Sequence, residues 1–127
     1  ELTKSDMSKG DYKRPYFNQD KSVKTKSADW RNFKNSGYNK GHLCPAADRK
    51  SSYEMYELTF LTSNASPQLY DFNAGIWNRL EQKTRYWAER YDGIYVITGG
   101  VLEDGLKTID DVENRLEANN GYKNWKF

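Results

Sequence analysis

Residues 72–91 carry the one long helical pattern in this sequence, and this pattern constrains the fold more than any other feature. We expect a helix over this range, beginning after Asp71 as an N-cap and ending at Gly93. Apolar side chains three and four positions apart would share one face of that helix. They lie within FNAGIWNRLEQKTRYWAERY, at Ile76, Trp77, Leu80, Trp87 and Tyr91.

Short extended segments are expected around this helix. Residues 38–48 combine Gly41 with Pro45, which indicates the end of a strand that runs into a loop. Residues 57–62 and 94–102 have the apolar content of buried strands. The other segments are expected to be less regular: loop and short extended pieces over 1–38, a loop over 63–71 and a short helix over 110–118.

Strands mixed with one long helix predict an α+β fold, and 127 residues are enough for one domain over 1–127. The net charge of +2 excludes a protein that binds nucleic acid by overall charge alone. Lysines and arginines gather in the first fifty residues instead, so either a local phosphate-binding patch or a solvated basic loop region fits the composition. No apolar run is long enough to cross a membrane, so no membrane partner is expected.

His42, the only histidine, is the first candidate for chemistry. A neutral imidazole accepts a proton near neutral pH, as few other side chains can. His42 follows a glycine, lies beside basic residues and is followed by Pro45 and Asp48. A lone histidine more commonly has a structural role, and this setting shifts the balance toward a catalytic one.

The predicted helix supplies a second group of candidates, Asn73, Trp77, Glu81 and Arg85. They follow one another at intervals of four, and such a row stays on one side of a helix. Asn and Glu oxygens suit a hard cation such as Mg²⁺, and an arginine suits a phosphate. An ordinary amphipathic helix with an ion pair between Glu81 and Arg85 explains the same row, so the helix alone does not decide.

Three motifs in order relate the sequence to a known family. They lie in SGYNKGHLCPAADR and TFLTSNASPQLYDFNAGIWNRLE: first Gly41, His42, Pro45 and Asp48; then Ser63, Asn64, Pro67 and Gln68; then Asn73, Gly75, Trp77, Leu80 and Glu81. Together they resemble the DNA/RNA non-specific endonucleases, ββα-metal nucleases that include secreted bacterial nucleases and mitochondrial endonuclease G. The resemblance covers about residues 12–100. It implies an α+β fold with a ββα-metal finger core on a mostly antiparallel sheet with flanking helices.

The resemblance also implies an activity and a site. The activity would be metal-dependent hydrolysis of phosphodiester bonds in DNA and RNA, with little sequence preference and with contact through backbone phosphates. His42 would be the general base. Asn73 would bind Mg²⁺, with Mn²⁺ as a substitute, and Glu81 would orient a water on that ion. The supporting residues would be Asn64 and the phosphate-binding cations Lys40, Arg14 and Arg85.

Departures from the family motif leave an alternative open. Asn39 and Lys40 stand where the motif has Asp and Arg, and lysine lacks the bidentate fork of arginine. The chain also looks shortened, which predicts a reduced sheet whose exposed edge favours a homodimer. The alternative is a catalytically weakened nucleic-acid-binding derivative of the same scaffold. We expect a secreted or periplasmic location, and an inhibitor protein would be a further partner.

Overall fold

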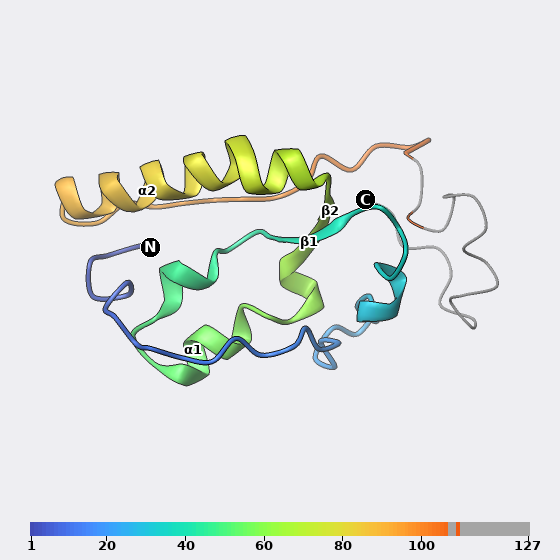
Figure 1. Ribbon diagram of the computed structural model, residues 1–127, viewed down its shortest axis with the longest axis horizontal. Helices are drawn as coiled ribbons and strands as arrows, with labels where there is room; N and C mark the ends of the chain where they lie inside the picture. The colour runs from blue at the N-terminus through green and yellow to red at the C-terminus, as the bar shows by residue number, and fades with distance from the viewer. Residues whose placement is uncertain (107–108, 110–127) are drawn as a thin grey trace.

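The computed structural model describes residues 1–106 and residue 109. Its helices and strands are β1 (Asn39–His42), α1 (Tyr53–Leu58), β2 (Ala65–Gln68) and α2 (Asn78–Arg90), with short 3₁₀ turns at Trp30–Asn32, Ala46–Arg49 and Thr62–Asn64. In this part of the chain the sheet is one antiparallel pair, β1 with β2, and α2 follows it (Figure 1). The fold is therefore α+β with a ββα core and a small sheet, as predicted. No helix in the described ranges is long and apolar enough to cross a bilayer.

A glycine in β1 leaves room for a side chain of β2. Asn39 lies opposite Gln68 and His42 lies opposite Ala65. A Cβ atom added to Gly41 would lie 2.2 Å from the Gln68 side chain, which is buried. Gly41 therefore allows the Gln68 side chain to pack directly on β1, beside His42 in the sequence of the strand.

The helix predicted over residues 72–91 is interrupted. A separate helical turn, Phe72–Trp77, precedes α2, and the backbone of Gly75 (φ −97°, ψ −106°) makes a kink within it. Asp71 makes no side-chain cap, so that expectation is wrong. Gly93 does end the helix as predicted: its φ is +111°, and its N–H donates to the Ala88 carbonyl at 2.8 Å.

Residues 57–62 do not form the predicted strand. The Ser52 hydroxyl accepts a hydrogen bond from the Met55 N–H at 3.2 Å and starts α1. Tyr56 and Phe60, four positions apart, are both buried against the core, so this apolar run follows a helical period. Strand-like pairing is limited to one parallel bridge between Asn18 and Leu61.

The strand end predicted within residues 38–48 is confirmed by β1, but the strand predicted over residues 94–102 does not form. Residues 94–102 run alongside α2 as an extended segment (Figure 1), but within the described chain only Ile94 is bridged, to Leu2. Residues 63–71, predicted as a loop, contain β2, with Pro67 in a strand that has one partner. Strand pairing joins residues far apart in the sequence, which local patterns do not report. The helix predicted over 110–118 lies outside the described residues.

The core beneath the sheet is aromatic. Phe17, Tyr56 and Phe60 are buried together, and Tyr12 and Ala65 pack against them. Residues 1–38 are largely irregular, as predicted, so side chains from this segment enter the core without a regular element to carry them.

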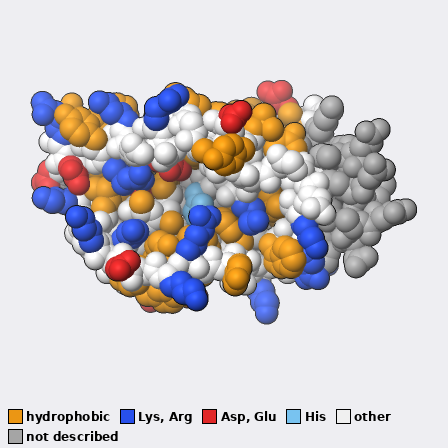
Figure 2. Space-filling view, in the orientation of Figure 1, with side chains coloured by type: hydrophobic (Ala, Val, Ile, Leu, Met, Phe, Trp, Pro, Cys, Tyr) orange, Lys and Arg blue, Asp and Glu red, His pale blue; other side chains and the backbone are white. Residues whose placement is uncertain are grey.

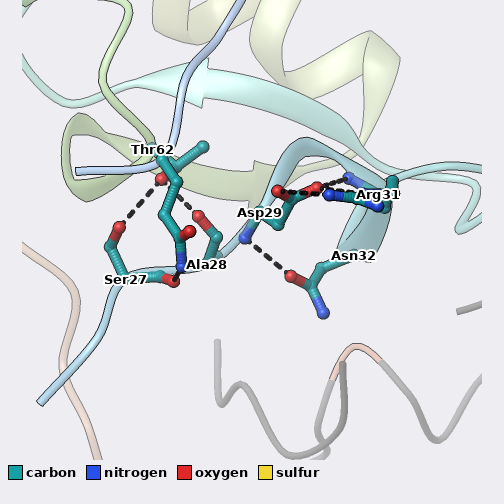
Figure 3. A network of polar contacts seen from close by, with 7 residues as sticks. Ser27, Ala28, Asp29, Arg31, Asn32 and Thr62 are labelled. Carbon is teal, nitrogen blue, oxygen red and sulfur yellow. Dashed lines mark hydrogen bonds and ion pairs between the residues drawn. The ribbon is translucent and has the colours of Figure 1, made fainter. Parts of the chain in front are cut away.

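A polar network ties the N-terminal segment to the turn before β2 (Figure 3). The Thr62 hydroxyl donates to the Ala28 carbonyl and lies 3.3 Å from the Ser27 hydroxyl. Asn32 is fully buried, and its amide oxygen accepts a hydrogen bond from the Asp29 N–H at 2.8 Å. These bonds satisfy polar groups that burial would otherwise leave unpaired, so they hold the irregular segment in place.

Candidate active site

A cavity of about 340 Å³ opens between β1, α2 and the N-terminal segment. Figure 2 shows the only histidine side chain on this face, among Lys and Arg side chains. The lining includes six of the seven residues predicted from sequence: Arg14, Lys40, His42, Asn73, Glu81 and Arg85. Segments far apart in the sequence therefore bring a base, oxygen donors and cations into one space.

His42 is held by aromatic rings. Its ring centroid lies 5.1 Å from that of Phe17 and 4.9 Å from that of Phe60. Trp77 donates a hydrogen bond from its indole to the His42 carbonyl at 3.1 Å, which ties the strand to the helix. Burial, with a smaller contribution from Arg14, lowers the pKa of His42 to about 4. The imidazole is therefore neutral at pH 7 and is able to accept a proton.

The low pKa of His42 predicts that stability falls in acid. Between pH 6.5 and about 4, His42 is protonated in the unfolded chain but stays neutral in the folded chain. The free energy of unfolding therefore decreases as the pH falls. The loss should approach about 3 kcal/mol. Urea unfolding of the metal-free protein from pH 7 to pH 4 measures it. His42→Phe keeps an aromatic ring but has no titrating group, so its loss of stability between pH 7 and pH 4 should be smaller than that of the wild type by this amount. Equal losses in the two proteins would contradict the lowered pKa of His42.

Lys40 and Arg14 are oriented by aromatic faces. The Lys40 ammonium lies 5.6 Å from the centroid of the Phe17 ring, and the Arg14 guanidinium lies 5.4 Å from that of Phe60. Burial, assisted by Arg14, lowers the pKa of Lys40. Within the described residues neither cation pairs with a carboxylate. Both charges are therefore available to a phosphate.

Arg85 has a different setting, because it pairs with a buried carboxylate. Its guanidinium lies 2.9 Å from the Asp48 carboxylate, and the two side chains are 21% and 6% exposed. Burial raises the pKa of Asp48, and Arg85 opposes that rise. The sequence pattern had suggested an ion pair between Glu81 and Arg85, which does not form. It gave no sign of the bond to Asp48, since that partner lies 37 positions away.

Asn73 and Glu81 offer oxygen donors to the cavity. The Asn73 amide has no side-chain hydrogen bond within the described chain, and burial raises the pKa of Glu81 against the opposing charge of Arg85. No cluster of three or more His, Cys, Asp or Glu side chains suitable for a metal occurs in the described residues. An amide oxygen and one carboxylate nevertheless fit Mg²⁺, which keeps several of its waters.

Asn64 lies outside the cavity lining. Its side-chain oxygen accepts from the Cys44 N–H at 2.9 Å, and its amide donates to the Cys44 and Thr59 carbonyls, each at 2.9 Å. These bonds hold the backbone that follows His42. The structure thus gives Asn64 a supporting position, away from the reacting space.

Sequence reasoning missed three residues that shape the cavity. Phe17 and Phe60 clamp the imidazole, but Phe60 had been assigned to a strand. Asn78 lines the cavity beside Asn73, although five positions separate them. The kink at Gly75 lies between them, and the glycine itself was the only local signal of it.

Comparison with known proteins identifies the family. The model of the DNA/RNA non-specific endonuclease family matches residues 1–124, so the chain belongs to that family. It is 37% identical to mitochondrial nuclease EXOG of Xenopus laevis, over 78% of this chain and 29% of that protein. It is 32% identical to the mitochondrial nuclease of Saccharomyces cerevisiae, over 86% of this chain and 33% of that protein. It is 36% identical to human mitochondrial endonuclease G, over 71% and 31%.

A solved structure agrees with this assignment. A chain in the crystal structure of the EndoG/EndoGI complex superposes with a TM-score of 0.62 and 30% identity, over 68% of this chain and 38% of that one. The chain spans between 22% and 33% of the length of the curated relatives. The expectation of a secreted or periplasmic location is wrong, because those relatives are named as mitochondrial nucleases.

Proposed function

We propose that this chain carries the catalytic site of a metal-dependent endonuclease that hydrolyses phosphodiester bonds in DNA and RNA with little sequence preference. The convergence of His42, Asn73, Glu81 and three cations on one cavity carries the proposal. The nuclease names of the relatives support it. Membership of the family does not by itself show that these side chains lie in one cavity of this chain.

His42 acts as the general base. Its Nε2 atom is buried without a partner, so Nδ1 is the atom that accepts the proton of the attacking water. The water oxygen then bonds to phosphorus, the bond from phosphorus to the leaving sugar oxygen breaks, and that oxygen takes a proton from solvent. The low pKa of His42 keeps the base unprotonated at neutral pH.

Negative charge on the phosphate oxygens is met by cations. Arg14 and Lys40 approach from the N-terminal segment and β1, and Arg85 approaches from α2. Asn73 and Glu81 would hold Mg²⁺, which when bound stabilises charge on the phosphate as a Lewis acid. Contacts to the phosphate backbone carry no base information, which accounts for weak sequence preference.

Digestion of supercoiled plasmid and of total RNA, with Mg²⁺ or with EDTA, tests the proposal. We expect both substrates to be degraded only when the metal is present. A chain that retains DNA at low salt but cuts neither substrate would overturn it. That result would favour the alternative, a non-cutting nucleic-acid-binding derivative in which Asn39 and Lys40 weaken the site.

A mitochondrial location belongs to the same proposal, because the relatives carry it in their names. Co-fractionation with a mitochondrial marker would test it. A homodimer remains a prediction, which sedimentation velocity would test. An inhibitor partner is proposed by analogy with the solved relative, whose structure is described as an inhibited complex.

A further inference from the structure

One aromatic side chain, two positions from the cavity-lining Arg14 in the sequence, makes no contact with the described part of the chain that supports the fold. Tyr16 is 91% exposed, and its side chain makes no hydrogen bond or ring contact within the described residues. Both of its chain neighbours are buried to a greater degree, and Phe17 packs against His42. A ring that gains so little from packing adds little to stability, so its removal should leave the fold intact.

The backbone fixes where this ring stands. The Asn18 N–H donates to the Phe60 carbonyl at 3.0 Å, and the Asn18 carbonyl accepts from the Thr62 N–H at 2.8 Å. These bonds prevent the segment from turning over and burying Tyr16. Arg14, two positions away, lines the cavity, and its Cα atom is at most roughly 7 Å from that of Tyr16. In the sequence, the exposed ring therefore comes two positions after a proposed phosphate-binding cation and directly before the residue that contacts the general base.

We propose that Tyr16 is a base-stacking subsite, which gives the chain a preference for single-stranded DNA or RNA. The inference rests on the proposed function, since it adds a base contact to the phosphate contacts of the cavity. A base in a duplex has both faces covered by its neighbours, whereas a base in a single strand offers a free face to an aromatic ring. Stacking of this kind accepts every base, so it is compatible with weak sequence preference.

Binding measurements test the subsite without requiring turnover. The probes are a fluorescent oligothymidine, a duplex of the same length and an abasic strand, each in EDTA at one fixed salt concentration. We expect Tyr16→Ser to weaken binding of oligothymidine about 5- to 100-fold. Binding of the duplex and of the abasic strand should stay within about twofold, and Tyr16→Phe should behave like the wild type.

Tyr95→Ser is the matched control, because Tyr95 is 84% exposed and no residue within two positions of it lines this cavity. This variant should bind all three probes like the wild type. Equal loss of oligothymidine and duplex binding by Tyr16→Ser, or loss of neither, would overturn the stacking subsite. A wild type with no affinity for oligothymidine would overturn it as well.

Plasmid cleavage in Mg²⁺ separates this inference from the proposed function. Tyr16→Ser should cut the duplex plasmid at close to the wild-type rate. If the wild type does not cut plasmid while the stacking effect on binding is present, the nuclease proposal fails and the subsite stands. If the wild type cuts plasmid and Tyr16→Ser binds oligothymidine normally, the nuclease proposal stands and the subsite fails.

Discussion

His42→Ala should lower kcat/KM for plasmid and for RNA about 10²- to 10⁴-fold, the range expected for loss of a general base. In the proposed mechanism the neutral imidazole is the proton acceptor, and solvent water replaces it poorly. Affinity for an oligonucleotide should change little, because Arg14, Lys40 and Arg85 remain. Initial rates in Mg²⁺, together with anisotropy binding in EDTA, measure the two quantities.

A variant that keeps the aromatic packing separates catalysis from structure. His42→Phe preserves a ring between Phe17 and Phe60 but has no basic nitrogen, so it should be as inactive as His42→Ala. Activity restored by phenylalanine would show that His42 serves only as packing. The pH dependence is a second readout: wild-type kcat/KM should rise with pH through about 4 and be level above pH 6.

Arg85→Met should lower the free energy of unfolding by about 3–5 kcal/mol, since it leaves the Asp48 carboxylate buried without its partner. The Asp48 side chain is only 6% exposed, so water does not replace the lost guanidinium. Such a loss is a large part of the total stability of a small domain, about 5–15 kcal/mol. Urea unfolding at pH 7 measures it.

The double variant Asp48→Asn/Arg85→Met should recover most of that stability, because no charge then stays buried. Arg79→Met is the matched control: Arg79 is exposed on the same helix, and its loss should cost under about 0.5 kcal/mol. In Arg85→Met, protonation of the Asp48 carboxyl removes the free-energy cost of burying an unpaired negative charge. Its folded pKa then lies further above the unfolded value, so the deficit of Arg85→Met should grow as the pH rises from 4 to 7. A deficit independent of pH would refute this account.

Local sequence patterns predicted some elements and misled on others. The helical period gave most of α2, because residues three and four apart share a face whatever surrounds them. The strand expected over 57–62 became the end of α1 and a turn, since the apolar run fits either period and the Ser52 cap selects the helix. β2 was missed because Ala65–Gln68 is a strand only through its pairing with β1, more than twenty positions away.

The candidate site was likewise predicted only in part from the sequence. The motifs named His42, Asn73 and Glu81, and the cavity contains all of them. They also named Asn64, whose hydrogen bonds turn out to hold the backbone after His42. Spacing did not show the aromatic clamp on the imidazole, because Phe17 comes from a segment without a motif and Phe60 belongs to a run that had been assigned to a strand.

By itself the sequence determined which chemistry is available: one imidazole, an amide and a carboxylate on one helical segment, and a basic N-terminal region. Only the tertiary structure decided how these groups behave. It buries His42 and so lowers its pKa, and it gives Arg85 a partner in Asp48. Side-chain identity is a local property, whereas burial and charge pairing depend on distances between segments that only folding brings together.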